Sequence, residues 1–126
     1  VLFFYPKDNT PGCTQSVQDF RDFYPSFQQL GVNIYGVSRD TLKSHLRFSD
    51  KHQLPYGLIA DPEENLCQLF DVMKEKSMFG KRVRGIVRST FLFNAQGELV
   101  HEWIKVKIPG HTEEVLARAK ALVAAT

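Results

Sequence analysis

Cys13 is the residue of this chain best placed to do chemistry. It follows a short apolar run, residues 1–5, and stands just after Thr10 and Pro11, where an amphipathic pattern begins. Threonine is a common N-cap and proline suits the first helical position, so the sequence predicts a helix whose first turn holds Cys13. Free backbone N–H groups and the positive end of the helix dipole favour thiolate over thiol at such a position. The spacing therefore indicates a nucleophile.

Neighbouring residues could assist the sulfur. Gly12 leaves room for a substrate, and the Thr10 hydroxyl could donate to or accept from the sulfur or a substrate oxygen, although a cap alone also explains a threonine there. Arg88 precedes an apolar strand pattern, and it is either a solvated strand end or a cation that stabilises the thiolate. The competing interpretation of Cys13 itself is a buried cysteine without a role.

The sequence lacks the residue patterns that several other kinds of active or binding site require. Residue 16 is Ser16, so a thioredoxin-type Cys-x-x-Cys pair is excluded at Cys13. Cys67 is interpreted as a partly buried helix residue, with a redox partner of Cys13 as the alternative. Two cysteines and four scattered histidines predict no metal site, and no glycine-rich phosphate loop is present. His45, on an apolar helix face, is interpreted as a structural histidine.

The composition is typical of one soluble globular domain spanning residues 1–126. The 126 residues are 43% hydrophobic and 24% charged, and the net charge of +2 is too small to argue for nucleic acid or a charged membrane. No apolar run approaches the ~20 residues of a membrane helix. Neither a secreted disulfide pattern nor a signal peptide is visible, which favours the cytoplasm. Because Val1 opens directly in a strand, we expect an upstream segment to be missing.

Strands and helices must alternate to position Cys13. We predict strands at 1–5, 32–37 and 56–60, with a helix after each. Pro25 is expected to kink the first helix or to end it near Tyr24. The inward positions of that helix recur at spacings of three and four: Val17, Phe20, Tyr24, Phe27 and Leu30.

The second helix, at about 41–52, is predicted to begin at an Asp40 cap. Its expected inward face consists of Leu42, His45, Leu46 and Ser49. A third helix is predicted from the capping pattern Asp61-Pro62-Glu63-Glu64, and it carries Leu66, Leu69 and Phe70.

The last third of the chain is predicted to hold a loop, a hairpin and a helix. Residues 73–88 are expected to form a long loop, with at most a short strand at its end. Strands at 90–93 and 99–106 flank a turn in which Gly97 can take the left-handed conformation. Thr112 is expected to cap the final helix, whose inward residues are Val115, Leu116, Ala119, Leu122 and Val123.

This order of elements predicts an α/β fold. Right-handed crossovers make the first strands parallel, and the hairpin adds antiparallel edge strands. We expect a mixed central sheet flanked by helices on both faces. With a reactive cysteine at the first strand–helix junction, this is a thioredoxin-like arrangement.

The residues also resemble a known family. Pro6-x-x-x-Thr10-x-x-Cys13 matches the peroxiredoxin active-site signature, and residues 4–14 look like its bacterioferritin-comigratory, or Q-type, branch. The similarity continues through 36–40, 74–81 and 88–92, so it covers nearly the whole chain. Relatives of this branch carry a further hairpin upstream.

The resemblance implies a thiol peroxidase of antioxidant defence. Cys13 would be the peroxidatic cysteine, which becomes a sulfenic acid. Pro6 would shield the pocket, Thr10 and Arg88 would hold the peroxide, and the N–H groups of Gly12 and Cys13 would assist. The implied partners are a hydroperoxide and thioredoxin or another thiol, with no metal or organic cofactor. Members of this branch are often monomers.

The sequence departs from the family pattern at the resolving cysteine. Family members place that thiol at the position of Gln18 or at that of Ser49, and a glutamate where Ser16 stands. Three hypotheses follow: Ser49 is an engineered Cys→Ser change, an external thiol resolves a one-cysteine enzyme, or Cys67 resolves.

Two other functions remain open at this point. A non-catalytic binding scaffold could keep the fold after losing the resolving thiol. A thioredoxin-like disulfide reductase is the other alternative, and the missing second active-site cysteine argues against it.

Overall fold

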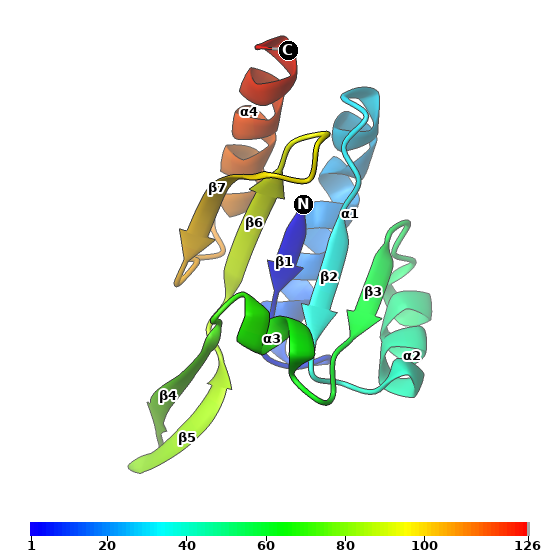
Figure 1. Cartoon of the computed structure of the whole chain (residues 1–126). Coiled ribbons are helices and arrows are strands. Elements are labelled where there is room, and N and C mark those ends of the chain that lie inside the picture. The colour runs from blue at the N-terminus through cyan, green and yellow to red at the C-terminus, as the bar shows by residue number, and fades with distance from the viewer. Residues whose placement is uncertain (126) are drawn as a thin grey trace.

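Five strands form one mixed sheet in a computed structural model that describes residues 1–125, without the side chains of Lys76 and Met78. Residue 126, the end of the predicted domain, lies outside the described residues. The strand order is β3-β2-β1-β6-β7, with the first three parallel and the last two antiparallel (Figure 1). The bounds are β1 (Leu2–Phe4), β2 (Tyr35–Ser38), β3 (Gly57–Ala60), β6 (Ser89–Phe93) and β7 (Leu99–Ile104). The predicted mixed sheet is confirmed.

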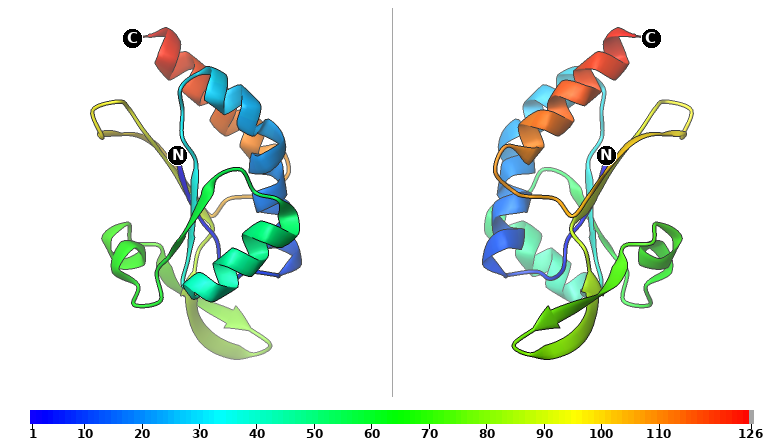
Figure 2. Two further views of the ribbon diagram at one scale, coloured as in Figure 1. Left: turned by 90° about the vertical axis from the view of Figure 1, so that its right-hand side faces the viewer. Right: turned by 90° about the vertical axis from the view of Figure 1, so that its left-hand side faces the viewer.

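Helices cover both faces of the sheet, as predicted. One face carries α1 (Pro11–Gln29), α2 (Leu42–His52) and α4 (His111–Ala124), and the other carries the short α3 (Asn65–Leu69) (Figure 2). Side chains alternate along β1, so Phe3 and Tyr5 enter the core under the three long helices. Phe4 enters a second core on the α3 side. The fold therefore has two separate apolar layers, one on each face of the sheet.

Helix α1 runs through Pro25 to Gln29, so of the two alternatives predicted for Pro25, a kink or an end near Tyr24, the end is wrong. The Pro25 ring stands on the exposed side of the helix, where water can hydrate the carbonyls that lack a donor. On the opposite side Phe20 and Phe27 are buried against the sheet, and this packing holds the helix together across the proline.

Helix α2 begins one residue later than predicted and is rotated from its expected face. Its cap is Thr41, whose side chain accepts from the Ser44 N–H, because the Asp40 carboxylate accepts from the Asp8 N–H instead. His45 and Phe48 point inward, and Ser49 is half-buried. Leu42 and Leu46, predicted to be buried, are 61% and 62% exposed.

Helix α3 begins after Glu64, whose φ is +64°, so the predicted start at Pro62 is wrong. Asp61 still serves the helix from a distance: its carboxylate accepts from the Leu66 and Cys67 N–H groups at 3.2 and 2.8 Å. Leu69, expected to pack, is 75% exposed.

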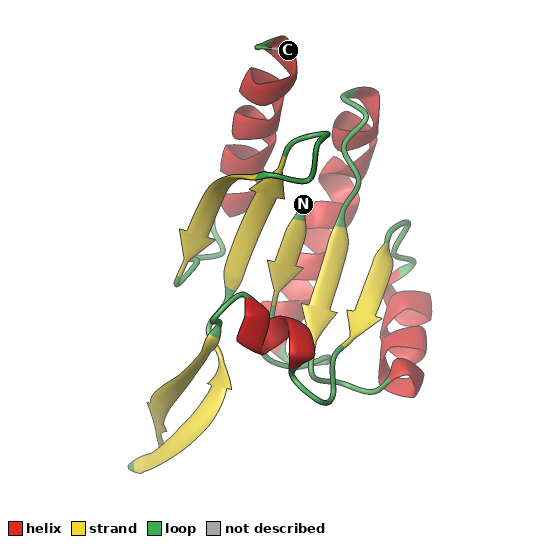
Figure 3. Cartoon of the chain, viewed as in Figure 1, coloured by secondary structure: helices red, strands yellow, loops and turns green. Residues whose placement is uncertain are grey.

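Residues 73–86 form a two-stranded hairpin, where a long loop was predicted. The strands β4 (Met73–Met78) and β5 (Lys81–Ile86) pair antiparallel and form a two-stranded sheet of their own (Figure 3). Phe79 and Gly80 connect them with φ values of +53° and +76°, as a type I′ turn requires. Phenylalanine is an unusual residue for that turn, so the Asn-Gly or Asp-Gly pair that usually predicts a hairpin is absent at residues 79–80.

The C-terminal elements follow the prediction except at their boundaries. Gly97 has the predicted left-handed φ of +79° in the β6–β7 turn. Gly110, with φ +76°, caps α4 in place of Thr112, which lies buried in the first turn. Val123, predicted to face inward, is 38% exposed.

His111 makes the stability of the fold dependent on pH. The ring is 8% exposed, and its Nε2 lies 2.8 Å from the Thr90 hydroxyl. Burial lowers its pKa from 6.5 to about 4, so as the pH falls from 6.5 to about 4 the unfolded chain takes up a proton that the native ring refuses. The free energy of unfolding should decline across that window. Urea titrations at pH 7, 5.5 and 4.5 should show a smaller decline in His111→Gln, and equal declines would contradict this assignment.

Candidate active site

Cys13 is the third residue of α1 and is 1% exposed. The first intrahelical bond runs from the Thr14 N–H to the Thr10 carbonyl at 2.9 Å. The N–H groups of Gly12 and Cys13 precede that bond, so they have no acceptor within the helix. Both these donors and the helix dipole favour negative charge at the sulfur. The predicted placement, with Thr10 before the helix and Pro11 first in it, is confirmed.

Thr10 uses its hydroxyl in the loop before the helix. Its Oγ1 donates to the Lys7 carbonyl at 2.8 Å and makes no capping hydrogen bond. Because its proton is committed to Lys7, the hydroxyl oxygen has lone pairs left to accept a hydrogen bond. Of the two options that the sequence left open, this geometry favours Thr10 as an acceptor. Pro6 is half-buried in the same loop.

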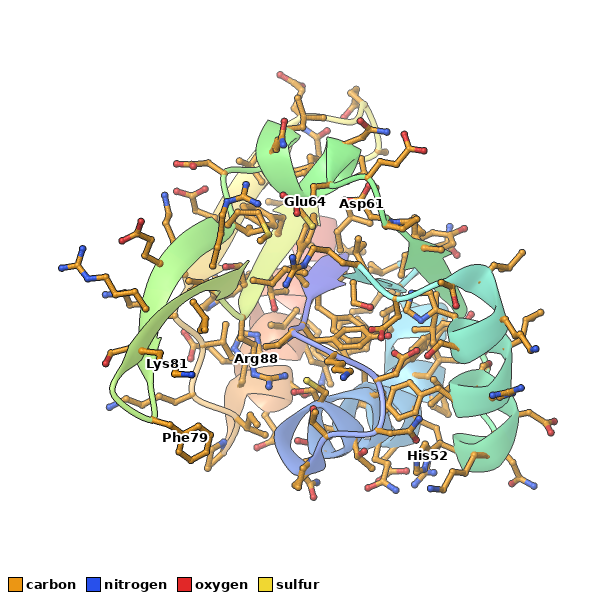
Figure 4. The ribbon with its side chains drawn as sticks, turned by 90° about the horizontal axis from the view of Figure 1, so that it is seen from below. His52, Asp61, Glu64, Phe79, Lys81 and Arg88 are labelled. Carbon is orange, nitrogen blue, oxygen red and sulfur yellow. The ribbon has the colours of Figure 1, made fainter. Side chains whose placement is uncertain are left out.

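Arg88 brings a positive charge to the sulfur from the segment between β5 and β6. Its Nη2 donates to Cys13 Sγ at 3.4 Å, and its Nη1 donates to Ser16 Oγ at 2.7 Å. Figure 4 shows Arg88 directed toward the N-terminal end of α1. A cation at this distance stabilises the thiolate against the thiol. Ser16, which the sequence marked as a missing thiol and as a departure from the family's glutamate, holds the guanidinium in place.

Gly12 permits the guanidinium to approach this closely. A Cβ at Gly12 would lie 3.2 Å from Arg88 Nη2 and 3.3 Å from Ile108 Cδ1. A larger residue would therefore push Arg88 away from Cys13.

A buried polar network fixes the loop that carries Pro6 and Thr10. The Asp8 carboxylate accepts from the Tyr5 hydroxyl and the Ser44 hydroxyl, both at 2.7 Å, and lies 2.8 Å from His45 Nδ1. Burial acts to raise the pKa of Asp8, and the hydrogen bonds from His45, Ser44 and Tyr5 outweigh it and hold the pKa below its ordinary value. The loop is thus tied to helix α2 through an ionised carboxylate.

The same network extends to the end of β2. Asp40 accepts from the Asp8 N–H at 2.9 Å and from the Ser38 hydroxyl, while His45 Nε2 lies 3.0 Å from the Ile59 carbonyl. Asp8, Asp40 and His45 are close enough to bind a metal ion together. Each of them already has hydrogen-bond partners from the protein, and these account for the cluster as a structural network.

The structure does not bring the second cysteine to the first. Cys13 belongs to the core under α1, whereas Cys67 lies fully buried in the core on the α3 side of the sheet. Burial, with the Asp61 carboxylate adding to it, raises the pKa of the Cys67 thiol to about 12. Cys67 is therefore a poor nucleophile for a sulfenic acid at Cys13.

A cavity of about 600 Å³ lies beside Arg88. Its walls come from the base of the β4–β5 hairpin and from the end of β7. The other lining residues are Lys74, Glu75, Val87, Ile104, Lys105 and Val106. It offers aliphatic side chains together with two lysines and a glutamate next to the residue that contacts the sulfur.

Within residues 1–125, the helices are all too short or too polar to span a membrane.

Comparison with known proteins gives a consistent result. A model of the AhpC/TSA family matches residues 1–102. The peroxiredoxin Bcp of Xanthomonas campestris pv. campestris is 51% identical over 121 residues, which are 96% of this chain and 76% of the relative. Peroxiredoxin Bcp of Bacillus subtilis is 50% identical over 120 residues, 95% of this chain and 76% of the relative.

A solved structure of a relative has the same fold. It is the Xanthomonas campestris bacterioferritin comigratory protein, studied for alkyl peroxide reduction in trapped intermediate and ligand complexes. Its TM-score is 0.92 at 50% identity, and the match covers 97% of this chain and 78% of that one.

Proposed function

The chain belongs to the AhpC/TSA family, as a thiol-dependent peroxidase of the Bcp, or Q-type, peroxiredoxin branch, and we propose that Cys13 is its peroxidatic residue. The Cys13 thiolate attacks one peroxide oxygen and the O–O bond breaks. That oxygen stays on sulfur as a sulfenic acid, and the other takes a proton and leaves as water or an alcohol. The 3.4 Å contact between Arg88 and Cys13 Sγ is the observation that carries the proposal.

The groups around the sulfur each have a role in this step. Arg88 stabilises the attacking thiolate and then the charge that develops on the departing oxygen. The Thr10 hydroxyl accepts from the peroxide O–H, and the N–H groups of Gly12 and Cys13 donate to the reacting oxygens. Pro6 shields the pocket from water. The Arg88–Ser16–Cys13 contacts speak against a non-catalytic scaffold, which has no use for a cation held against a buried sulfur.

Reduction of the sulfenic acid needs a thiol from outside the chain. Ser49 and Gln18 offer no thiol, and Cys67 lies across the sheet. A reductant thiolate attacks the sulfenic sulfur, the S–O bond breaks, and water leaves after taking a proton. A second thiol then displaces Cys13 from the mixed disulfide. Thioredoxin or another thiol is the proposed reductant of a monomeric, cytoplasmic enzyme, and light scattering after gel filtration tests the monomer.

Intact mass spectrometry after one equivalent of peroxide tests the proposal. A gain of one oxygen, retained in Cys67→Ala and absent from Cys13→Ser, is the expected result. A loss of two hydrogens would mean that Cys13 and Cys67 have joined, and it would overturn the external-thiol step.

Ser49→Cys is expected to change the oxidised product. The family resemblance places the resolving thiol at this half-buried position of α2, so the variant should lose two hydrogens after peroxide and form a disulfide with Cys13. Leu46→Cys is the matched control, because Leu46 is on the same helix but 62% exposed. The control should gain one oxygen like the parent chain. The same product from both variants would contradict the assignment of position 49.

A further inference from the structure

The β4–β5 hairpin, residues 73–86, projects from the domain and is called the arm below. Its two strands form a sheet of their own, and Figures 1 and 2 show the arm standing away from the main sheet. In Figure 4 its tip, marked by Phe79 and Lys81, reaches past Arg88 on the side of the molecule where α1 begins. The arm therefore stands on the side of the molecule where Arg88 and the start of α1 lie.

A contribution to folding does not explain why the tip of the arm carries a phenylalanine at position 79. Its side chain is 98% exposed, and its backbone takes a φ of +53°, which glycine or asparagine adopts more easily. An exposed aromatic ring in a strained turn contributes little to folding. Aromatic residues of this kind are enriched among the residues that dominate binding energy at protein interfaces.

The arm also concentrates the positive charge of the chain. Its sequence has five Lys or Arg residues and one Glu, so it has a net charge of +4, and the rest of the chain has a net charge of −2. Glu75 pairs with Arg82 at 3.4 Å within the arm, and Glu64 pairs with Arg84 at its base. Lys81, two residues after Phe79, is exposed, and no carboxylate of a described side chain pairs with it. A partner that fits the tip must be acidic.

The base of the arm connects this surface to the sulfur. Lys74 and Glu75 of the arm line the cavity of about 600 Å³ that Arg88 also lines. A molecule seated on the arm would thus lie against the cavity whose Arg88 contacts Cys13 Sγ at 3.4 Å.

We infer that the arm is the docking surface for a protein thiol reductant, which presents an apolar pocket for Phe79 within an acidic surface. This inference rests on the proposed function, because it needs a sulfenic acid at Cys13 and an external thiol to reduce it. The reductant thiolate attacks the sulfenic sulfur and expels water, and the reductant's second thiol then releases Cys13 and leaves the reductant as a disulfide.

Steady-state turnover of the double variant Phe79→Asn, Lys81→Glu tests the arm. Asparagine before Gly80 suits the type I′ turn, so the hairpin is kept while the ring and the charge are removed. With thioredoxin, its reductase and NADPH, the KM for thioredoxin should rise about tenfold, the effect of losing an interface anchor worth about 1.4 kcal/mol. Turnover with dithiothreitol and single-turnover oxidation of Cys13 by hydrogen peroxide should stay unchanged, since neither reaction uses the arm.

The control variant is Leu42→Ala, Lys120→Glu, which removes an exposed apolar side chain and an exposed charge elsewhere. It should leave every rate unchanged. An unaltered thioredoxin KM in the arm variant, or no turnover with thioredoxin where dithiothreitol works, would overturn the docking inference and leave the peroxidase chemistry standing. A concentration-dependent dimer that the arm variant abolishes would assign the arm to a second copy of this chain instead. If hydrogen peroxide does not oxidise Cys13 of the parent chain in a single turnover, the proposed function itself is overturned.

Discussion

Replacing Cys13 by serine is expected to lower peroxide turnover by at least about 10⁴-fold, the range that the loss of a catalytic nucleophile costs in other enzymes. A serine hydroxyl stays protonated where a thiol ionises, so Arg88 and the helix terminus would have no anion to stabilise. Consumption of hydrogen peroxide with dithiothreitol as reductant is the measurement. Circular dichroism should remain that of the parent, because the substitution removes no packing volume of note.

Cys67→Ala is the matched control for this experiment. Cys67 lies in the core on the other side of the sheet, so its loss should leave turnover with dithiothreitol unchanged. A fall in thermal stability is expected, since the side chain is fully buried. An active Cys13→Ser protein, or a folded Cys67→Ala protein without turnover, would refute the assignment of the nucleophile.

Arg88→Gln should reduce kcat/KM for peroxide by about 10²- to 10³-fold, comparable to the loss of an oxyanion donor. Glutamine is shorter than arginine and uncharged, so it brings no charge to Cys13 Sγ and loses the contact with Ser16 Oγ. Alkylation of Cys13 by iodoacetamide at pH 7 should therefore be slower in the variant, and a purely structural role of Arg88 would leave that rate unchanged. Stopped-flow oxidation and alkylation rates at pH 7 are the two measurements.

Two further variants separate charge from geometry. Arg88→Lys keeps the positive charge, but a lysine lacks the two Nη atoms that contact Ser16 Oγ and Cys13 Sγ at the same time. We therefore expect partial peroxidase activity and an alkylation rate close to that of the parent chain. Arg47→Gln removes an exposed arginine of α2 and should change neither rate. An Arg88→Gln protein that matches the parent in both measurements would remove Arg88 from the reaction.

Local signals in the sequence were sufficient to predict the position of Cys13 in the first turn of a helix. Thr10 and Pro11 specify a helix start within four residues, and the alternation of strands and helices specifies the order of a thioredoxin-like sheet. Nothing local placed Arg88 at the sulfur, because 75 residues separate them and only the pairing of β6 with β1 brings the two together. Ser16 was missed for the same reason: its partner comes from another element.

The errors at the starts of α2 and α3 share one physical cause. Asp40 was expected to cap α2 and Glu64 to complete a capping box, but tertiary partners take both carboxylates: the Asp8 N–H takes the first and two arginines take the second. The face of α2 was misjudged in part: His45 points inward as expected, but Phe48 is the other buried residue, and Leu42 and Leu46 are exposed. Capping rules describe a helix alone and cannot weigh such competitors.

The sheet that separates the two sulfurs also determines how excess peroxide can inactivate this enzyme. A sulfenic acid that waits for its reductant can meet a second peroxide and advance to sulfinic acid, a state that thiols do not reverse. Under the proposed mechanism, the described residues 1–125 bring no second cysteine to the face of the sheet on which Cys13 lies, so the sulfenic acid depends on an external thiol. Survival during a peroxide burst would then depend on how much reduced thiol surrounds the protein, so the chain would act as a peroxidase when thiol is plentiful and as a sacrificial scavenger when it is scarce.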